Sequence, residues 1–196
     1  MNLQKLVLAS NNAKKLQELA ALLSPLGIQL MPQRELGVAE CDEPHCTFVE
    51  NALAKARHAA AMTGLPALAD DSGLCVDALS GAPGVHSARY ADEPKSDARN
   101  NQKLIDALQN ETNRNARFVC VIVLARHATD PQPIIVEGEW HGEILPAPKG
   151  AGGFGYDPLF LDKESGLASA ELSPEVKNRK SHRGLAMQAL IKRLAA

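Results

Sequence analysis

Two adjacent carboxylates, Asp70 and Asp71, follow a short apolar run at 67–69 and precede Ser72 and Gly73. Because successive side chains of a strand point to opposite faces, we expect the two carboxylates to diverge. One of them could face a ligand while the other holds its own backbone or a neighbour. Gly73 allows a sharp turn, which predicts that the strand ends there. In isolation, a surface Asx-turn explains this tetrapeptide better than a catalytic or metal-binding carboxylate does.

Lys14 and Lys15 are candidates for phosphate binding. They open a predicted helix at 13–23, which follows a predicted strand at 5–9 and the turn Ser10-Asn11-Asn12. The free N–H groups of a helix N-terminus, together with a lysine, attract anions. The turn contains no glycine, so it is neither a Walker A loop nor a dinucleotide-binding fingerprint. A solvated helix start with two lysines is the simpler explanation of this segment alone.

A glycine-rich segment at 150–158 frames Phe154, Tyr156 and Asp157 with four glycines. Glycines let the backbone approach a ligand closely, and aromatic faces suit a planar ring. Asp157 could accept hydrogen bonds from ring N–H groups. A tight β-bulge around a core phenylalanine explains the segment equally well by itself.

Two helix starts near the C-terminus bring cations together. Ser173, followed by a proline, caps one predicted helix, and Ser181 precedes another. Lys177, His182 and Arg183 therefore lie near helix ends, from which they could reach one anionic ligand.

The remaining segments predict the elements that would position these groups. A capping box at Thr47 and Glu50 opens an alanine-rich helix that carries Lys55 and ends near Met62. Further elements are predicted as a helix at 97–108 and strands at 28–31, 74–76, 117–125 and 134–145. Parallel pairing of the early strands and a long hairpin formed by the last two predict a mixed sheet in an α/β fold.

Composition limits the classes of protein. The 196 residues are 45% hydrophobic and 22% charged, which suits one globular domain, or two closely joined lobes without a linker. A formal charge of −2 argues against a nucleic-acid-coating protein, and the sequence shows no secretory or membrane segment. The four cysteines form no Cys-x-x-Cys pair, and Cys41, His45 and Cys46 lack a second ligand pair for zinc. A reduced, cytoplasmic protein is expected.

Taken together, the motifs resemble the inosine triphosphate pyrophosphatase family, whose members hydrolyse deaminated purine nucleoside triphosphates. The matching segments are residues 10–15, Glu43 with 47–48 and 50–52, 55–56, 69–73, 81–84 with 87–90, 152–157, Lys177 and 181–184. They occur in the family's order and span nearly the whole chain. Each segment alone is weak, but eight in register argue strongly against a chance match.

This resemblance implies an elongated α/β structure, in which a mixed sheet flanked by helices forms two lobes around a central nucleotide-binding cleft. Residues 1–196 would form a single domain without a separable linker. The family is usually homodimeric and requires Mg²⁺. The substrates would be dITP or ITP and XTP or dXTP, hydrolysed to the monophosphate plus pyrophosphate. Removing them from the nucleotide pool would prevent their incorporation into DNA or RNA.

The resemblance also assigns roles by position. Asp71 takes the general-base role, and Glu43 with Asp71 would hold Mg²⁺. The positions expected to cradle phosphates are Ser10, Asn11, Asn12, Ala13, Lys14 and Lys15, while Lys55 would contact the triphosphate and Ser72 the substrate. The positions expected to recognise the purine are Phe154, Gly155, Tyr156, Asp157, Lys177, His182 and Arg183. Donors from His182 or Arg183 would favour the 6-oxo group of inosine over the 6-amino group of adenine.

Two positions depart from the family's common pattern. Asn11 stands where glycine is frequent and could narrow the phosphate loop, because asparagine adopts positive φ less freely. Pro44 should stiffen the loop that carries Glu43. The role of Asp70 stays open, as does the basis on which guanine is rejected. Two alternatives also stay open: a related pyrophosphatase acting on modified pyrimidine or general triphosphates, and a non-catalytic nucleotide sensor or adaptor.

Overall fold

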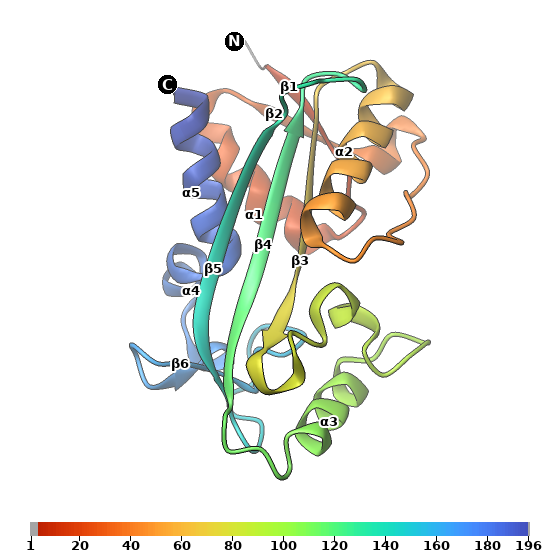
Figure 1. The fold of residues 1–196 in the computed structure, drawn as a ribbon. Helices are drawn as coiled ribbons and strands as arrows, with labels where there is room; N and C mark the ends of the chain where they lie inside the picture. The colour runs from red at the N-terminus through yellow and green to blue at the C-terminus, as the bar shows by residue number, and fades with distance from the viewer. Residues whose placement is uncertain (1–3, 196) are drawn as a thin grey trace. The chain divides into compact units, whose positions relative to one another are not determined.

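The computed structural model describes residues 4–195 of the 196-residue chain, apart from five side chains in the first helix, those of Ala13, Lys14, Glu18, Ala21 and Leu22. Within the described residues, seven strands form one sheet in the order β2-β1-β3-β4-β5-β6-β7 (Figure 1). β1 pairs in parallel with β2 and β3, whereas β6 pairs antiparallel with β5 and β7. The predicted α/β fold with a mixed sheet is therefore confirmed.

The strands are β1 (Lys5–Leu8), β2 (Gln29–Pro32), β3 (Ala67–Val76), β4 (Asn115–Ala125), β5 (Ile134–Ile144), β6 (Phe160–Asp162) and β7 (Leu167–Ala168). The helices are α1 (Ala13–Leu23), α2 (Phe48–Thr63), α3 (Asp97–Ala107), α4 (Pro174–Lys180) and α5 (His182–Ala195). In the part of the chain that is described, no helix is long and apolar enough to cross a membrane.

The chain divides into two compact units, each assembled from separate segments. Unit 1 takes the N-terminal part of the chain through Asp71, residues 120–138, and the C-terminal part from Leu185. Unit 2 takes residues 72–119 and 139–184. The boundaries fall inside β3, β4, β5 and α5, so these three strands and this helix contribute to both units.

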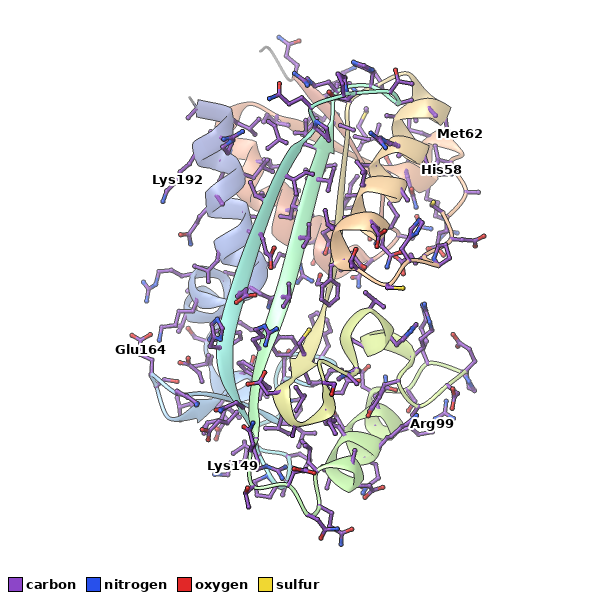
Figure 2. All side chains as sticks on the ribbon, viewed as in Figure 1. His58, Met62, Arg99, Lys149, Glu164 and Lys192 are labelled. Carbon is purple, nitrogen blue, oxygen red and sulfur yellow. The ribbon has the colours of Figure 1, made fainter. Side chains whose placement is uncertain are left out.

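Unit 1 packs helices on both faces of its strands. One core joins buried strand residues to α1 and α5; its members include Leu6, Leu8, Leu68, Cys120, Ile122 and Leu124, with Leu19, Leu23, Met187 and Leu190 from the helices. α2 contacts β1 and buries Ala52, Ala56, Ala59 and Ala60, the close packing that its alanines predict. Figure 1 shows α2 and α5 on opposite sides of the strands, and Met62 of α2 remains exposed (Figure 2).

Unit 2 has its own core, built around aromatic side chains. The rings of Phe118, Trp140 and Phe160 contact one another with centroids 4.6 to 6.3 Å apart. Leu104 and Leu108 pack into this core. The core therefore joins α3 to β4, β5 and β6.

The predicted helix starts are confirmed. Thr47 Oγ1 accepts a hydrogen bond from the N–H of Glu50 at 3.3 Å, and its hydroxyl donates to the Glu50 carboxylate at 2.6 Å. Glu50 thus reaches back to the hydroxyl of Thr47. Ser173 Oγ accepts from the N–H of Val176 at 3.4 Å and caps α4. These side chains satisfy N–H groups that the first turn of a helix leaves open.

The turn predicted at Gly73 is wrong. β3 continues unbroken from Ala67 to Val76, and Gly73 is buried within it. β1 pairs with β3 only at Ala67 and Leu68, so beyond them β4 is the strand beside β3, and continuing the strand keeps ladder partners for its backbone groups. Residues Gly84–Arg89 form a 3₁₀ helix.

Candidate active site

The two carboxylates of β3 lie on opposite faces of the strand, as alternation predicts. Asp70 shares a face with Leu68, which packs with α1, and its Oδ2 lies 2.7 Å from Nζ of Lys15 on α1. Asp71 faces α2, where its Oδ2 accepts a hydrogen bond from Asn51 Nδ2 at 3.1 Å. Both carboxylates are buried. Asp70 therefore contacts α1, and Asp71 contacts α2.

The segment between β1 and α1 is a turn held by its own side chains. Ser10 Oγ accepts from the N–H of Asn12 at 3.2 Å, and Asn12 Oδ1 accepts from the N–H of Lys15 at 3.2 Å. Asn11 donates to Glu40 at 2.8 Å and is not among the residues with positive φ. The conformational cost expected for a non-glycine residue at this position therefore does not arise.

Of the two lysines predicted to bind phosphate, Lys15 has a described side chain. The side chains of Lys14 and of Ala13, which is also predicted to cradle phosphates, lie outside the described set. The Lys15 side chain keeps 18% of its surface exposed while Asp70 is almost fully buried. Asp70 therefore anchors a lysine that can still present charge to an anion.

Lys55 of α2 lies between the two carboxylates predicted to hold a metal ion. Its Nζ is 2.5 Å from Glu43 Oε1 and 3.6 Å from Asp71 Oδ1. Glu43 belongs to the irregular segment before α2, whereas Asp71 belongs to β3. One ammonium group thus brings together carboxylates from two separate parts of unit 1.

Burial and mutual attraction shift the ionisation of Asp71 and Lys55. Burial raises the pKa of Asp71, and the charge of Lys55 with the Asn51 hydrogen bond offsets only part of that rise. Burial alone would lower the pKa of Lys55, but the negative charges of Asp71, Asp70 and Glu43 outweigh it and raise that pKa. Lys55 is therefore cationic at neutral pH, and Asp71 is a stronger base than an exposed aspartate.

Glu43 and Asp71 are a suitable ligand pair for Mg²⁺. This ion prefers carboxylate oxygens and fills the rest of its octahedral shell with waters or phosphate oxygens. The two carboxylates already stabilise one positive charge, that of Lys55. Within residues 4–195, no group of three or more His, Cys, Asp or Glu side chains is arranged to hold a metal. Among the described residues, the candidate metal site therefore has two protein ligands, Glu43 and Asp71.

Asn51 belongs to this site, although the sequence analysis did not select it. Besides contacting Asp71, its Oδ1 accepts from the N–H of His45 at 3.1 Å and its Nδ2 donates to the His45 carbonyl at 3.3 Å. The available signal was a polar residue among the buried alanines of α2, one turn before Lys55.

In unit 2, Phe154 presents an aromatic face to solvent. The residue is 38% exposed, and Nζ of Lys177 lies 5.4 Å from its ring centroid. Tyr156 differs, because it is buried and its hydroxyl donates to the carbonyl of Ser87 at 2.8 Å. Burial raises the pKa of Tyr156, so this hydroxyl stays protonated. Phe154 is therefore partly exposed to solvent, whereas Tyr156 is not.

Asp157 is occupied within the protein. Its Oδ2 accepts from the N–H of Phe154 at 2.8 Å and pairs with Nζ of Lys177, while its Oδ1 accepts from the Ser169 hydroxyl at 2.8 Å. A Cβ at Gly153 would lie 2.2 Å from Asp157 Oδ2, so only glycine lets the loop close around this carboxylate. Asp157 thus links Phe154 and Lys177, and its contact with ring N–H groups of a base stays a prediction.

Two side chains of α3, which the sequence analysis missed, hold Gly155. Its N–H donates to Asp97 Oδ2 at 2.7 Å, and its carbonyl accepts from Asn101 Nδ2 at 3.0 Å. Asp97 and Asn101 are one helical turn apart and share a face of α3. The polar face of this helix was the only sequence signal, and it did not specify a partner.

His182 and Arg183 begin α5 in a tightly packed turn. The His182 ring stacks on Phe118 with centroids 4.9 Å apart and an interplanar angle of 14°, and Arg183 is buried. A Cβ at Gly184 would lie 1.9 Å from the carbonyl oxygen of Asn178, so α4 and the start of α5 approach closely. His182 and Arg183 therefore lie in a closely packed part of unit 2.

The predicted site residues divide between the units. The positions predicted to bind phosphate or metal, of which Asp71 is the last in the sequence, belong to unit 1. The positions predicted to recognise the purine belong to unit 2. Ser72 directly follows Asp71 in β3 and is the first residue of unit 2.

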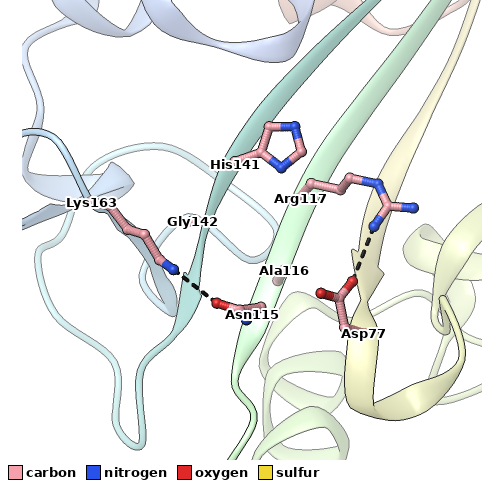
Figure 3. A pocket seen from close by; sticks show the side chains of 7 residues that line it. All are labelled: Asp77, Asn115, Ala116, Arg117, His141, Gly142 and Lys163. Atoms are coloured by element: carbon pink, nitrogen blue, oxygen red, sulfur yellow. Dashed lines mark hydrogen bonds and ion pairs between the residues drawn. The ribbon is translucent and has the colours of Figure 1, made fainter.

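A separate hollow of about 220 Å³ in unit 2 is lined by Asp77, Asn115, Ala116, Arg117, His141, Gly142 and Lys163 (Figure 3). Arg117 pairs with Asp77 at 3.1 Å, and Lys163 donates to Asn115 at 2.8 Å. None of the predicted nucleotide-binding residues lines this hollow. Because its cations are exposed and paired with neighbours, we assign no ligand to it.

Known proteins resemble the chain over almost its full length. A sequence model of the Ham1 family matches residues 6–193. A dITP/XTP pyrophosphatase of Aromatoleum aromaticum is 63% identical over 97% of this chain and 96% of that protein, and one of Nitrosomonas europaea is 62% identical over 98% and 95%. The solved structure of a HAM1 protein from Coxiella burnetii matches with a TM-score of 0.95 and 49% identity, covering 97% of this chain and 98% of that one.

Proposed function

The chain belongs to the Ham1 family, and we infer that it hydrolyses deaminated purine nucleoside triphosphates such as dITP and XTP to the monophosphate and pyrophosphate. This inference rests on one observation. The buried Asp71 carboxylate lies beside Lys55, and Glu43 forms an ion pair with the same lysine. The activity would remove these nucleotides from the pool used for nucleic-acid synthesis.

The residues of unit 1 suit hydrolysis between the α- and β-phosphates. This reaction needs cations that offset the charge of the triphosphate and a carboxylate that orients the attacking water. Lys15 and Lys55 supply the charge, each held by a buried carboxylate. Asp71 orients the water.

We propose that Glu43 and Asp71 hold Mg²⁺, with waters and phosphate oxygens as the other ligands. When bound, this ion would supply electrostatic stabilisation of the phosphate oxygens. Lys55, which bridges both carboxylates in the structure, would then turn its charge to the triphosphate.

Recognition of the base is assigned to unit 2. The exposed ring of Phe154 stacks on the purine, and Lys177 lies over the same ring. Donors from His182 or Arg183 favour a 6-oxo group. The 6-amino group of adenine would leave such donors without an acceptor, at a cost of about 1–3 kcal/mol per buried group.

A panel of nucleoside triphosphates tests the proposal. The purified protein with Mg²⁺ should release pyrophosphate rapidly from dITP and XTP, with GTP and ATP nearly inert. Preference for a pyrimidine triphosphate would overturn this assignment in favour of a related pyrophosphatase. Tight binding of dITP without turnover would instead identify a nucleotide sensor.

We also propose a cytoplasmic homodimer, which the family resemblance supports. Sedimentation equilibrium should give twice the 20.9 kDa mass of one chain. A mass of one chain across the micromolar range would contradict the dimer.

A further inference from the structure

Asn51 links two parts of unit 1 that carry the proposed metal-binding carboxylates. It is 1% exposed, and its side chain makes three hydrogen bonds. Nδ2 donates to Asp71 Oδ2 at 3.1 Å and to the His45 carbonyl at 3.3 Å, while Oδ1 accepts from the His45 N–H at 3.1 Å. Both hydrogens of the amide are therefore used.

His45 stands two residues after Glu43, in the irregular segment at 38–47. Such a segment has no helix or strand hydrogen bonds, so side-chain contacts determine where its residues stand. Asn51 occupies both backbone groups of His45 and thereby restricts the chain next to Glu43. The same amide is bonded to Asp71, which connects the irregular segment directly to β3.

We propose that Asn51 is a positioning residue, which holds the Glu43 segment against Asp71 so that both carboxylates meet the same cation. This inference rests on the proposed function, because it takes Glu43 and Asp71 as the ligands. Asn51 acts through His45 and Asp71 and is not itself a catalytic residue.

The chemistry of the three bonds requires an amide. A carboxylate at position 51 could still accept from the His45 N–H, but it would present an oxygen to Asp71 Oδ2 and to the His45 carbonyl, both of which are acceptors. Repulsion between buried acceptors is strong where water is excluded. Asn51→Asp therefore breaks the link while it preserves the shape of the side chain.

Asn100 provides a matched control in unit 2. It is 3% exposed; its Oδ1 accepts from the N–H of Ala91 at 2.7 Å, and its Nδ2 donates to the carbonyls of Ser87 and Ala88 at 3.4 and 3.2 Å. All three bonds go to backbone groups. Asn100→Asp therefore measures what the substitution costs at a buried asparagine that contacts neither proposed ligand.

The experiment compares full-length wild type, Asn51→Asp and Asn100→Asp. Amide hydrogen exchange of residues 38–47, without metal or substrate, reports the link directly. Binding of Mn²⁺, followed by electron paramagnetic resonance, and the Mg²⁺ concentration for half-maximal dITP hydrolysis report its effect on the metal. In Asn51→Asp we expect the amides of residues 38–47 to exchange faster. We also expect the affinity for Mn²⁺ to fall, and the Mg²⁺ concentration for half-maximal hydrolysis to rise, by about 10- to 100-fold. Asn100→Asp should match wild type in all three.

Wild-type exchange and wild-type Mn²⁺ affinity in folded Asn51→Asp would overturn the proposal, as would equal losses in Asn100→Asp. If Asn51→Asp does not fold, Asn51→Ser provides the same comparison with a smaller polar side chain. A wild type that releases no pyrophosphate from any triphosphate would refute the proposed function. The exchange and Mn²⁺ measurements would still test the link in that case.

Discussion

Asp70 and Asp71 are neighbours in β3, yet each pairs with a lysine of a different helix. Asp70 Oδ2 lies 2.7 Å from Lys15 Nζ of α1, and Asp71 Oδ1 lies 3.6 Å from Lys55 Nζ of α2. The Asp70 side chain is 1% exposed, whereas that of Asp71 is 10% exposed. Asp70 thus pairs with Lys15 on α1, and Asp71 is the more exposed of the two carboxylates.

Asp71→Asn should abolish catalysis while it preserves binding. The amide keeps the shape of the carboxylate but cannot accept a proton or balance a metal ion. We expect turnover of dITP to fall by about 10²- to 10⁴-fold. Equilibrium dialysis with dITP should show an affinity close to that of wild type. Turnover near the wild-type value would refute the role of Asp71.

Lys15→Met should destabilise the protein more than Asp70→Asn does. Removing Lys15 strips the buried Asp70 carboxylate of its ion-pair partner, a change that costs about 3–5 kcal/mol when a buried charge loses its partner. Removing the charge of Asp70 leaves a lysine whose side chain is 18% exposed and can be hydrated. Urea unfolding measures both losses, and a larger loss in Asp70→Asn would contradict this order.

Phe154→Ala and Tyr156→Phe should separate binding from stability. Stacking on an aromatic ring contributes about 1–3 kcal/mol per base, so Phe154→Ala should raise KM for dITP by roughly 5- to 150-fold. Tyr156→Phe removes the bond to Ser87 and should lower the free energy of unfolding by about 1 kcal/mol, with KM almost unchanged. A wild-type KM in Phe154→Ala would refute stacking on Phe154.

Asp130 should contribute a pH-dependent part of the stability of unit 1. It is buried in the loop between β4 and β5, where it accepts from Arg126 Nε at 2.7 Å and from the Gln132 N–H at 3.0 Å. The Arg126 guanidinium holds the pKa of Asp130 well below its usual range. In the unfolded chain this group takes up a proton near pH 4, so its contribution is present above about pH 4 and declines below it.

The test for Asp130 is urea unfolding of wild type and Asp130→Asn between pH 7 and pH 3. At pH 7 the variant should unfold at lower urea. The difference between the two urea midpoints should shrink as the pH falls. Wild type then loses the stabilising charge of Asp130, which the variant lacks at every pH. A difference that is independent of pH would contradict the role of the Asp130 charge.

Local signals allowed most elements to be predicted. The caps at Thr47 and Ser173 and the apolar period of residues 13–23 act over one or two turns, so the sequence contains the whole determinant. Gly73 shows the limit of prediction from local sequence. Whether a glycine turns or continues a strand depends on the strands beside it, and here β4 lies beside β3.

By itself the sequence determined the family, the order of the elements and the residue types of the site, because motifs and periodicity are local properties. Only the tertiary structure decided the partners. Asn51 meets Asp71, and Lys177 meets Asp157, each across 20 residues of sequence. A donor on a helix has several acceptors at compatible spacing, and the packing of that helix selects one of them. For the same reason Asp157 contacts Lys177 and Ser169, and Phe154 is partly exposed.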